Sequence, residues 1–239
     1  MAVKAVFFDM DGTILDTLGD LTDALNHAFK EAGHRADYGI EMTKLFFGSG
    51  VKVAVKRGLA TEAGVDKDKL DLIGTEKEKT IYVADDKEVE RITKIYMPYY
   101  AANCNIKTGP YKGIIEAIRR IREKGIKTAV VSNKPDVAVK KLSEDLFYGL
   151  FDISLGEAEG IRRKPAPDML KKAMDNLNVT AEDSVYVGDS EIDMLTAKNS
   201  DMRCISCDWG FRSRDYLEKQ GADPIVSDAN EMLEKILDI

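Results

Sequence analysis

The chain has 239 residues, which is enough for one large domain or two modest ones. Hydrophobic residues make up 44% and charged residues 32% of it, a composition typical of a folded chain rather than a disordered or membrane-embedded one. With 42 acidic against 35 basic side chains, the net charge is −7, which argues against nonspecific binding to nucleic acid or anionic membranes. An anionic ligand would therefore need local positive partners, such as a metal ion, a few lysines or arginines, and backbone N–H groups.

The sequence predicts a cytoplasmic protein. No apolar run approaches the length of a membrane span, and the opening segment meets Asp9 too early for a signal-peptide core. The three cysteines, Cys104, Cys204 and Cys207, are an odd number without framework spacing, as expected in a reduced compartment. Cys204 and Cys207 have CxxC spacing but lack a partnering pair, so we assign them no zinc or redox role.

Short β-rich runs alternate with amphipathic helices along most of the chain. Residues 3–8 are apolar and β-branched apart from Lys4, as expected for a strand buried on both faces. Ile114, Ile118 and Ile121 fall on one face of a helix predicted over 113–124. Further strands are expected at 126–132, 151–155, 184–187, 202–206 and 225–226, and helices at 136–145, 167–177, 192–199 and the carboxyl-terminal end. This alternation predicts an α/β fold with a doubly wound parallel sheet.

Residues 17–105 follow a different pattern. Leu21, Leu25 and Phe29 belong to a helical stripe, and further helical pattern covers 51–59 and 89–100 without a convincing strand. We therefore expect an all-helical second domain over 17–105, inserted into an α/β core formed by 1–16 and 106–239. The chain would cross back near Gly109 and Pro110.

The first predicted strand ends in two aspartates, Asp9 and Asp11, followed by Gly12 and Thr13. Carboxylates at positions i and i+2 point to the same side of an extended segment, here at the carboxyl end of a strand, where ligands bind in open α/β sheets. Two such carboxylates repel one another unless a cation or a shared proton relieves them, and their hard oxygens suit Mg²⁺. The bland alternative is a solvated turn with two helix-capping residues.

Three later strand ends carry polar groups as well. Ser132 and Asn133 precede the helix expected from 136 and form a donor cluster suited to phosphate oxygens, or an ordinary helix cap. Lys164, held by Pro165, could neutralise a phosphate, or be a solvated loop lysine. Asp189 follows the strand at 184–187, and Asp193 lies one helical turn further on, with helix capping as the alternative role of this pair. Together these groups predict one site at the carboxyl ends of the strands.

These motifs resemble those of the haloacid dehalogenase-like phosphatases, over nearly the whole chain. Residues 9–13 look like the first motif of that family, Ser132-Asn133 the second, Lys164-Pro165 the third, and 188–190 with Asp193 the fourth. The helical insert resembles the family's first type of cap domain. Within the family the chain is most similar to the phosphoglycolate phosphatase group, although it reads Pro-Tyr-Lys-Gly at 110–113 where that group usually has Pro-Tyr-Pro-Gly.

The resemblance implies a role for each motif residue. Asp9 would attack phosphorus and form an aspartyl-phosphate, and Asp11 would act as general acid and then as general base. Mg²⁺ would be held by the Asp9 carboxylate, the Asp11 backbone carbonyl and Asp189. The remaining roles would be phosphate binding by Ser132, Asn133 and Lys164, and support by Thr13 and by Asp193, which would orient Lys164 or a metal-bound water.

Other conspicuous residues receive blander interpretations. His27 and His34 lack a partner pattern and are interpreted as surface or packing residues. Arg57 could reach a substrate carboxylate, but most arginines so placed are solvated. The segment from Trp209 to Arg212 follows a strand end and could border the site, and we assign it no catalytic role.

The sequence therefore predicts a Mg²⁺-dependent phosphatase for a small phosphorylated metabolite, with 2-phosphoglycolate the favoured substrate. Inorganic pyrophosphatase, nucleotidase or sugar-phosphate mutase activity could use the same residues, although residues 18–20 lack the histidine of familiar mutases. A phospho-accepting signalling domain is the alternative of a different class, but such domains are shorter and lack a helical insert. We expect no nucleic-acid or membrane partner, and either a monomer or a homodimer.

Overall fold

The computed structural model describes residues 3–239, so Met1 and Ala2 of the opening segment lie outside the described residues. The chain forms two compact units. One joins Gly109–Ile239 to the amino-terminal segment ending at Asp16, and the other is Thr17–Thr108. The insert expected from the sequence stopped at residue 105, slightly short of the end of this second unit.

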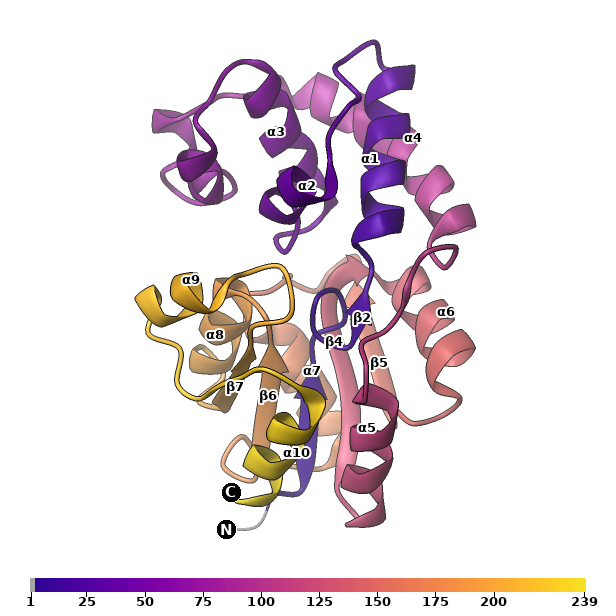
Figure 1. Cartoon of the computed structure of the whole chain (residues 1–239), viewed down its shortest axis with the longest axis vertical. Coiled ribbons are helices and arrows are strands. Elements are labelled where there is room, and N and C mark those ends of the chain that lie inside the picture. The colour runs from indigo at the N-terminus through magenta and orange to yellow at the C-terminus, as the bar shows by residue number, and fades with distance from the viewer. Residues whose placement is uncertain (1–2) are drawn as a thin grey trace. The chain divides into compact units, whose positions relative to one another are not determined.

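The first unit is built on a parallel sheet (Figure 1). Its strand order is β5-β4-β1-β6-β7-β8, with every neighbouring pair parallel. The strands are β1 (Ala5–Phe8), β4 (Lys127–Pro135), β5 (Ile153–Glu157), β6 (Ser184–Gly188), β7 (Arg203–Cys207) and β8 (Ile225–Val226). β1 is buried at every residue, as its uninterrupted apolar sequence requires in the middle of a sheet.

Helices cover both faces of this sheet, which confirms the predicted doubly wound α/β fold. α5 (Ile114–Glu123) and α10 (Ala229–Leu237) pack together on one face (Figure 1). α7 (Asp168–Leu177) and α8 (Glu191–Lys198) lie on the other, where the side chains of Phe7, Val131 and Tyr186 join the apolar stripe of α7 in one buried cluster. The remaining helices are α6 (Asp136–Phe147) beside β5 and the short α9 (Arg214–Lys219), which sequence reasoning did not identify.

One observed boundary changes the interpretation of a motif. β4 continues through Pro135, which pairs with Glu157 of β5 after an irregularity in register, and α6 starts only at Asp136. Ser132 and Asn133 therefore belong to a strand and do not cap a helix. The predicted helix start at residue 136 is confirmed. The alternative that Ser132 and Asn133 cap this helix was wrong, because the bulged strand goes on pairing beyond its apolar run.

A second, very short sheet was also missed. β2 (Leu15–Asp16) pairs antiparallel with β3 (Gly109–Pro110), with Leu15 opposite Pro110 and Asp16 opposite Gly109. In the sequence, β2 directly precedes the helical unit and β3 directly follows it, and both strands belong to the first unit. Strands of two residues are too short to leave a periodic pattern in the sequence.

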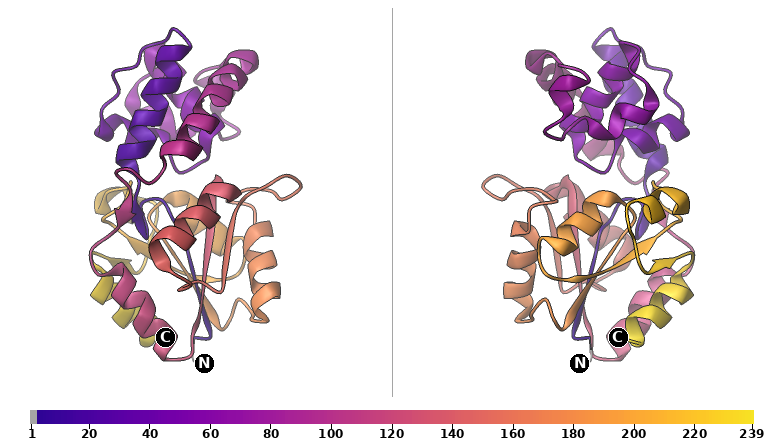
Figure 2. Two further views of the ribbon diagram at one scale, coloured as in Figure 1. Left: turned by 90° about the vertical axis from the view of Figure 1, so that its right-hand side faces the viewer. Right: turned by 90° about the vertical axis from the view of Figure 1, so that its left-hand side faces the viewer.

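The second unit consists of helices over the described residues. They are α1 (Leu18–Glu31), α2 (Ile40–Phe46), α3 (Val51–Glu62) and α4 (Asp86–Asn103), with 3₁₀ segments at Lys67–Leu72 and Glu78–Thr80. α1 and α4 pack against each other, as Figure 2 shows from two sides. The carboxylate of Asp20 at the start of α1 accepts hydrogen bonds from the backbone N–H groups of Lys107 and Thr108, so both ends of the unit are tied together.

Arg57 on α3 is a structural residue of this unit. Only 1% of it is exposed, and its guanidinium donates hydrogen bonds to the carbonyls of Phe46 and Ile73 at 3.1 Å, with longer bonds to those of Leu45 and Asp71. Both interpretations offered by the sequence, a substrate ligand and a solvated arginine, were therefore wrong. The guanidinium instead satisfies carbonyl groups at the ends of α2 and the first 3₁₀ segment.

His34, by contrast, gains two acidic partners that the sequence did not reveal. Its Nδ1 lies 2.7 Å from Glu62 Oε2 and its Nε2 2.7 Å from Glu88 Oε1, so the ring links the ends of α1, α3 and α4. Burial alone lowers the pKa of His34, but the hydrogen bonds to Glu88 and Glu62 outweigh it and raise that pKa above its ordinary value. Hydrogen bonds from Arg91 and His34 lower the pKa of Glu88 to about 2.

We therefore expect the His34 ion pairs to stabilise the protein in mildly acidic solution and to fade in alkali. Because the folded pKa is raised, the stabilisation is fully present below the unfolded histidine pKa of about 6.5 and disappears as pH rises through the folded value. Replacing His34 with glutamine should lower the free energy of unfolding by about 1 kcal/mol at pH 5.5. Urea unfolding of both proteins at pH 5.5 and pH 9 tests this, and an equal difference at both pH values would contradict the ion-pair explanation.

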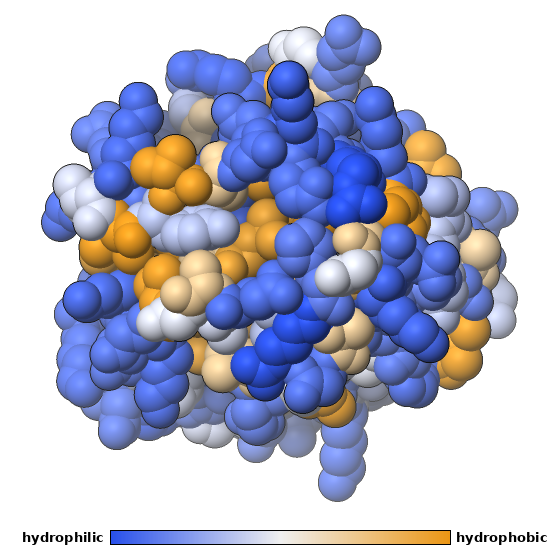
Figure 3. Space-filling model, turned by 90° about the horizontal axis from the view of Figure 1, so that it is seen from above, coloured by the Kyte–Doolittle hydropathy of each residue, from blue (hydrophilic) through white to orange (hydrophobic). Residues whose placement is uncertain are grey.

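Four large hydrophobic side chains of the helical unit are more than a third exposed: Ile40, Val83, Met97 and Ile106. The face drawn in Figure 3 is mostly hydrophilic, with apolar areas that gather toward one side of it. Among residues 3–239, no helix is both long and apolar enough to cross a membrane.

Candidate active site

Asp9 stands where the central strand ends. It directly follows β1, and its backbone N–H donates to the carbonyl of Val187 on the neighbouring β6 at 2.9 Å. The chain then turns tightly, with the N–H groups of Ile14 and Leu15 both returning to the carbonyl of Met10. Gly12 takes a positive φ of 84° in this turn, a conformation that residues with a Cβ rarely adopt. The turn leaves the Asp9 side chain buried at the carboxyl edge of the sheet.

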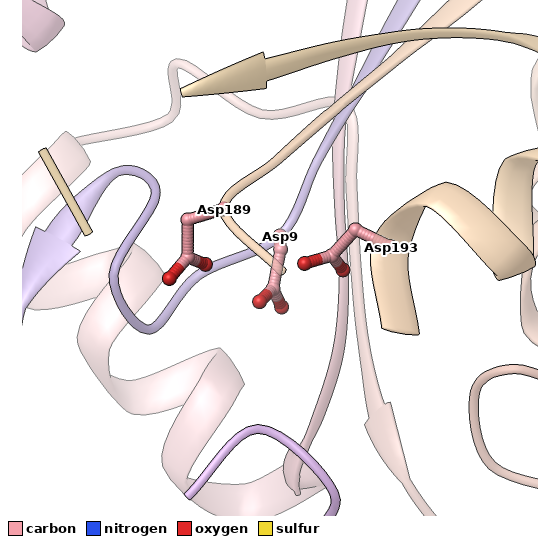
Figure 4. Close-up of side chains that lie close together, drawn as sticks. All are labelled: Asp9, Asp189 and Asp193. Carbon is pink, nitrogen blue, oxygen red and sulfur yellow. The ribbon is translucent and has the colours of Figure 1, made fainter. Parts of the chain in front are cut away.

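Three buried carboxylates meet at this edge. Asp9, Asp189 after β6, and Asp193 on the first turn of α8 each offer one oxygen, and these oxygens all lie within 4.8 Å of one another. In Figure 4 the Asp9 carboxylate lies between those of Asp189 and Asp193. The strand-end argument predicted this proximity, because the carboxyl ends of parallel strands meet at one edge.

Lys164 brings a positive charge to the same cluster. Its Nζ lies 2.9 Å from Asp9 Oδ1 and donates to Asp193 Oδ1 at 2.7 Å and to the Tyr186 hydroxyl at 2.9 Å. Burial lowers the pKa of Lys164, but the carboxylates of Asp193 and Asp9 outweigh it and raise that pKa well above its ordinary value. The lysine is therefore a fixed ammonium beside the Asp9 carboxylate.

Burial and mutual repulsion raise the pKa of the clustered carboxyl groups. Burial, opposed in part by Lys164 and reinforced by Asp193, raises the pKa of Asp9 to about 6. Burial together with the charges of Asp193 and Asp9 raises the pKa of Asp189 well above its usual range. Each shift shows that the cluster disfavours further negative charge, which is the condition a cation relieves.

Asp11 has a lysine partner of its own. Its Oδ1 lies 2.6 Å from the Nζ of the buried Lys134, on β4. The sequence argument was that a cation or a shared proton relieves the repulsion between Asp9 and Asp11. In the structure each of the two carboxylates has, in addition, a lysine partner of its own.

The two polar residues of β4 have different surroundings. Ser132 is buried, and its hydroxyl accepts a long hydrogen bond of 3.4 Å from the Lys134 N–H. Asn133 binds the backbone of Lys164 on both sides, accepting from its N–H at 2.8 Å and donating to its carbonyl at 3.0 Å. The amide of Asn133 therefore fixes the loop that carries Lys164.

Supporting contacts fix the two later aspartates. Asp193 closes a capping box with Ser190, whose hydroxyl and N–H both donate to its Oδ2. Gly188 must be glycine, because a Cβ there would lie 2.2 Å from the Cβ of Asp193. Asp189 Oδ1 accepts from the Thr13 hydroxyl at 3.0 Å, which joins the turn after β1 to the acid cluster.

The cluster has the chemistry of a divalent-cation site. Asp9, Asp189 and Asp193 with the single ammonium of Lys164 leave a formal charge of −2 among buried groups. Hard carboxylate oxygens of this kind suit Mg²⁺, and a divalent ion would balance the charge. The cluster contains Asp193, to which the sequence had given only a supporting role. It does not contain the side chain of Asp11, whose predicted ligand atom is the backbone carbonyl oxygen.

Sequence reasoning missed three groups around the site. Lys134 directly follows Ser132 and Asn133 in the sequence but received no role. Tyr186, at a buried position of β6, accepts from Lys164 and donates to the carbonyl of Val131. The backbone N–H of Phe211 donates to Asp189 Oδ2 at 2.7 Å. Any residue can donate through its backbone N–H, so the residue type at 211 does not reveal this contact. Tyr186 has the sequence pattern of an ordinary strand residue.

Comparison with known proteins identifies the family to which this chain is similar. A family model described as haloacid dehalogenase-like hydrolase matches residues 6–207. The chain is 31% identical to a phosphoglycolate phosphatase of Mesorhizobium japonicum over 91% of this chain and 88% of the relative. It is 27% identical to the enzyme of the same name from Pseudomonas fluorescens, over 98% of this chain and 80% of the relative.

A solved structure is more similar still. A crystal structure from Lactobacillus delbrueckii subsp. bulgaricus, provisionally named phosphoglycolate phosphatase, has a TM-score of 0.95 and 52% sequence identity, covering 99% of both chains. These matches confirm the resemblance inferred from the motifs. The chain belongs to the haloacid dehalogenase-like hydrolase family.

Proposed function

We propose that this hydrolase is a Mg²⁺-dependent phosphatase that cleaves 2-phosphoglycolate through an aspartyl-phosphate on Asp9. The coarser statement, that the chain is a phosphoric monoester hydrolase, follows from its family and relatives. The observation that supports the finer one is the Asp9 carboxylate, held between the ammonium of Lys164 and the carboxyl of Asp189 at the carboxyl edge of the sheet. Membership in a hydrolase family leaves the phospho-accepting signalling domain without support.

In the first half-reaction an Asp9 oxygen forms a bond to phosphorus while the bond to the leaving oxygen breaks. Asp11 gives its proton to that oxygen, which leaves as an alcohol. In the second half, a water attacks the phosphorus of the aspartyl-phosphate, gives its proton to Asp11, and releases phosphate and the Asp9 carboxylate. Dividing the displacement in this way replaces one difficult step with two easier ones.

The phosphoryl oxygens would lie against Lys164 and Ser132. Because Asn133 and Asp193 both bind Lys164, we assign them the positioning of its ammonium rather than direct phosphate contact. Thr13 holds Asp189 in the same way. Mg²⁺, held by Asp9, Asp189 and the Asp11 carbonyl, would supply positive charge that lowers repulsion between nucleophile and phosphate.

The helical unit Thr17–Thr108 would act as the cap that selects the leaving group and excludes water during turnover. The phosphoglycolate assignment rests on the names of the relatives, which match this chain at 27% and 31% identity. We propose a cytoplasmic enzyme whose partner is this small metabolite.

Steady-state phosphate release tests the proposal. With Mg²⁺ present we expect fast turnover of 2-phosphoglycolate, and loss of turnover when EDTA removes the metal. p-Nitrophenyl phosphate, pyrophosphate, a nucleoside monophosphate and a sugar phosphate serve as comparison substrates. Faster turnover of one of these would discard phosphoglycolate and keep the chemistry, whereas no release from any substrate with Mg²⁺ would contradict the phosphatase proposal.

A further inference from the structure

The loop between β7 and α9 lies against the acid cluster, although the proposed chemistry gives it no part. The backbone N–H of Phe211 donates to Asp189 Oδ2 at 2.7 Å. Thr13 donates to the other oxygen, Oδ1, at 3.0 Å. The carboxylate of Asp189 is thus held from two sides by donors on two different loops, and its plane is fixed.

At Gly210 the backbone of this loop lies so close to the cluster that no side chain would fit there. A Cβ on Gly210 would lie 2.3 Å from the carbonyl oxygen of Gly12 and 2.5 Å from the Cβ of Asp189. The indole N–H of Trp209 donates to the carbonyl of Thr13 at 3.0 Å. Both turns that surround Asp189 are therefore packed on the same short loop, and a shift of the loop would move the donor at Phe211.

A buried ion pair anchors this loop. The guanidinium of Arg212 donates to both oxygens of Glu191, from Nε at 2.9 Å and from Nη2 at 3.2 Å. Arg212 is only 6% exposed, and its guanidinium lies 5.7 Å from the centre of the Tyr216 ring. Glu191 is the first residue of α8, two positions after Asp189. The pair therefore ties the residue after Phe211 to the segment that carries Asp189.

We propose that Arg212, through its two-point ion pair with Glu191, positions the Phe211 N–H on Asp189 and so sets the affinity of the acid cluster for a divalent cation. Arg212 touches neither substrate nor metal in this scheme and is a positioning residue. A carboxylate ligand whose orientation is fixed loses less freedom on binding a metal, and removal of such supporting groups commonly weakens metal affinity by about 10- to 100-fold. The inference rests on the metal site of the proposed function.

The experiment is a Mg²⁺ titration that needs no substrate. Trp209 is the only tryptophan of the chain and lies in this loop, so its fluorescence reports on the site, with calorimetry as an independent readout. We expect Arg212→Met to raise the dissociation constant for Mg²⁺ by about 10-fold or more. Arg122→Gln is the matched control, since Arg122 lies on α5, pairs with Asp152 and has a side chain that is 32% exposed; it should leave the constant within about 2-fold of wild type.

Two milder variants cover the case in which Arg212→Met does not fold. Arg212→Lys keeps the charge but loses the two-point geometry, and Glu191→Gln removes the partner charge. Weaker Mg²⁺ binding in the folded variants supports the proposal, and unchanged binding in all of them overturns it. Wild-type protein that binds no Mg²⁺ also overturns it. If wild-type protein binds Mg²⁺ but releases no phosphate, only the proposed function fails, and the variants still decide the role of Arg212.

Discussion

Replacing Asp9 with asparagine should abolish phosphate release and leave the protein folded. The amide is isosteric with the carboxylate but cannot attack phosphorus, so we expect turnover to fall by about 10⁴-fold or more. Stability should not suffer in metal-free buffer. Asp9 is buried beside two other carboxylates, and its ionised form is disfavoured there, as its pKa of about 6 shows. The amide removes that unfavourable charge.

Phosphate release and thermal unfolding in EDTA, measured on the same preparation, test both halves of this expectation. Asp145→Asn is the matched control, because Asp145 makes an exposed ion pair with Lys141 on α6 and should tolerate the change without effect on either quantity. Turnover of the Asp9 variant near the wild-type rate would remove Asp9 as nucleophile. A melting temperature well below wild type would show that the carboxylate stabilises the fold.

Replacing Lys164 with methionine should destabilise the protein more than any other single change at the site. The ammonium contacts Asp9, Asp193 and the Tyr186 hydroxyl, all buried. Removing one partner of a buried ion pair strands the other charges, so we expect a loss of about 3–5 kcal/mol in the free energy of unfolding, together with loss of turnover. Urea unfolding at pH 7 in EDTA measures it.

The control for Lys164 is Lys52→Met, which removes an exposed ion pair with Glu90 and should cost at most about 1 kcal/mol. If stranded charge is the cause, adding Asp193→Asn to the Lys164 variant should recover part of the lost stability, giving a coupling energy between the two sites. A Lys164 variant as stable as wild type would mean that the carboxylates take up protons at no cost, contrary to the charge argument.

The residues that meet at the site could be predicted because the sheet is parallel. Asp9, Lys164 and Asp189 follow three different strands, and the doubly wound pattern sends the carboxyl ends of those strands to one edge. The sequence itself shows a charged or hydrogen-bonding residue after each of these strands. The convergence of Asp193 followed as well, since it lies one helical turn beyond Asp189 at the start of a helix.

Which side chains of the site bind each other could not be predicted in the same way. Whether Asp11 faces Asp9 or Lys134 depends on a turn of a few residues, and its conformation is decided by hydrogen bonds to the carbonyl of Met10. Arg57 illustrates the same limit in the helical unit, since a buried guanidinium bound to carbonyls has the same sequence signature as a solvated one. Backbone donors and carbonyl acceptors are present at every position, so residue type does not reveal which of them a fold uses.

The ribbon of β2 and β3 has a consequence for how such a protein can change over evolutionary time. Asp16 and Gly109 are paired neighbours, so the helical unit is attached to the α/β unit as an extended hairpin loop would be. Lengthening, shortening or exchanging that loop leaves the order and register of the six parallel strands untouched, because the ribbon keeps its two ends together whatever lies between them. If the helical unit selects the substrate, as proposed, substrate preference and catalytic chemistry lie in separate stretches of sequence, and selection can change the first without changing the second.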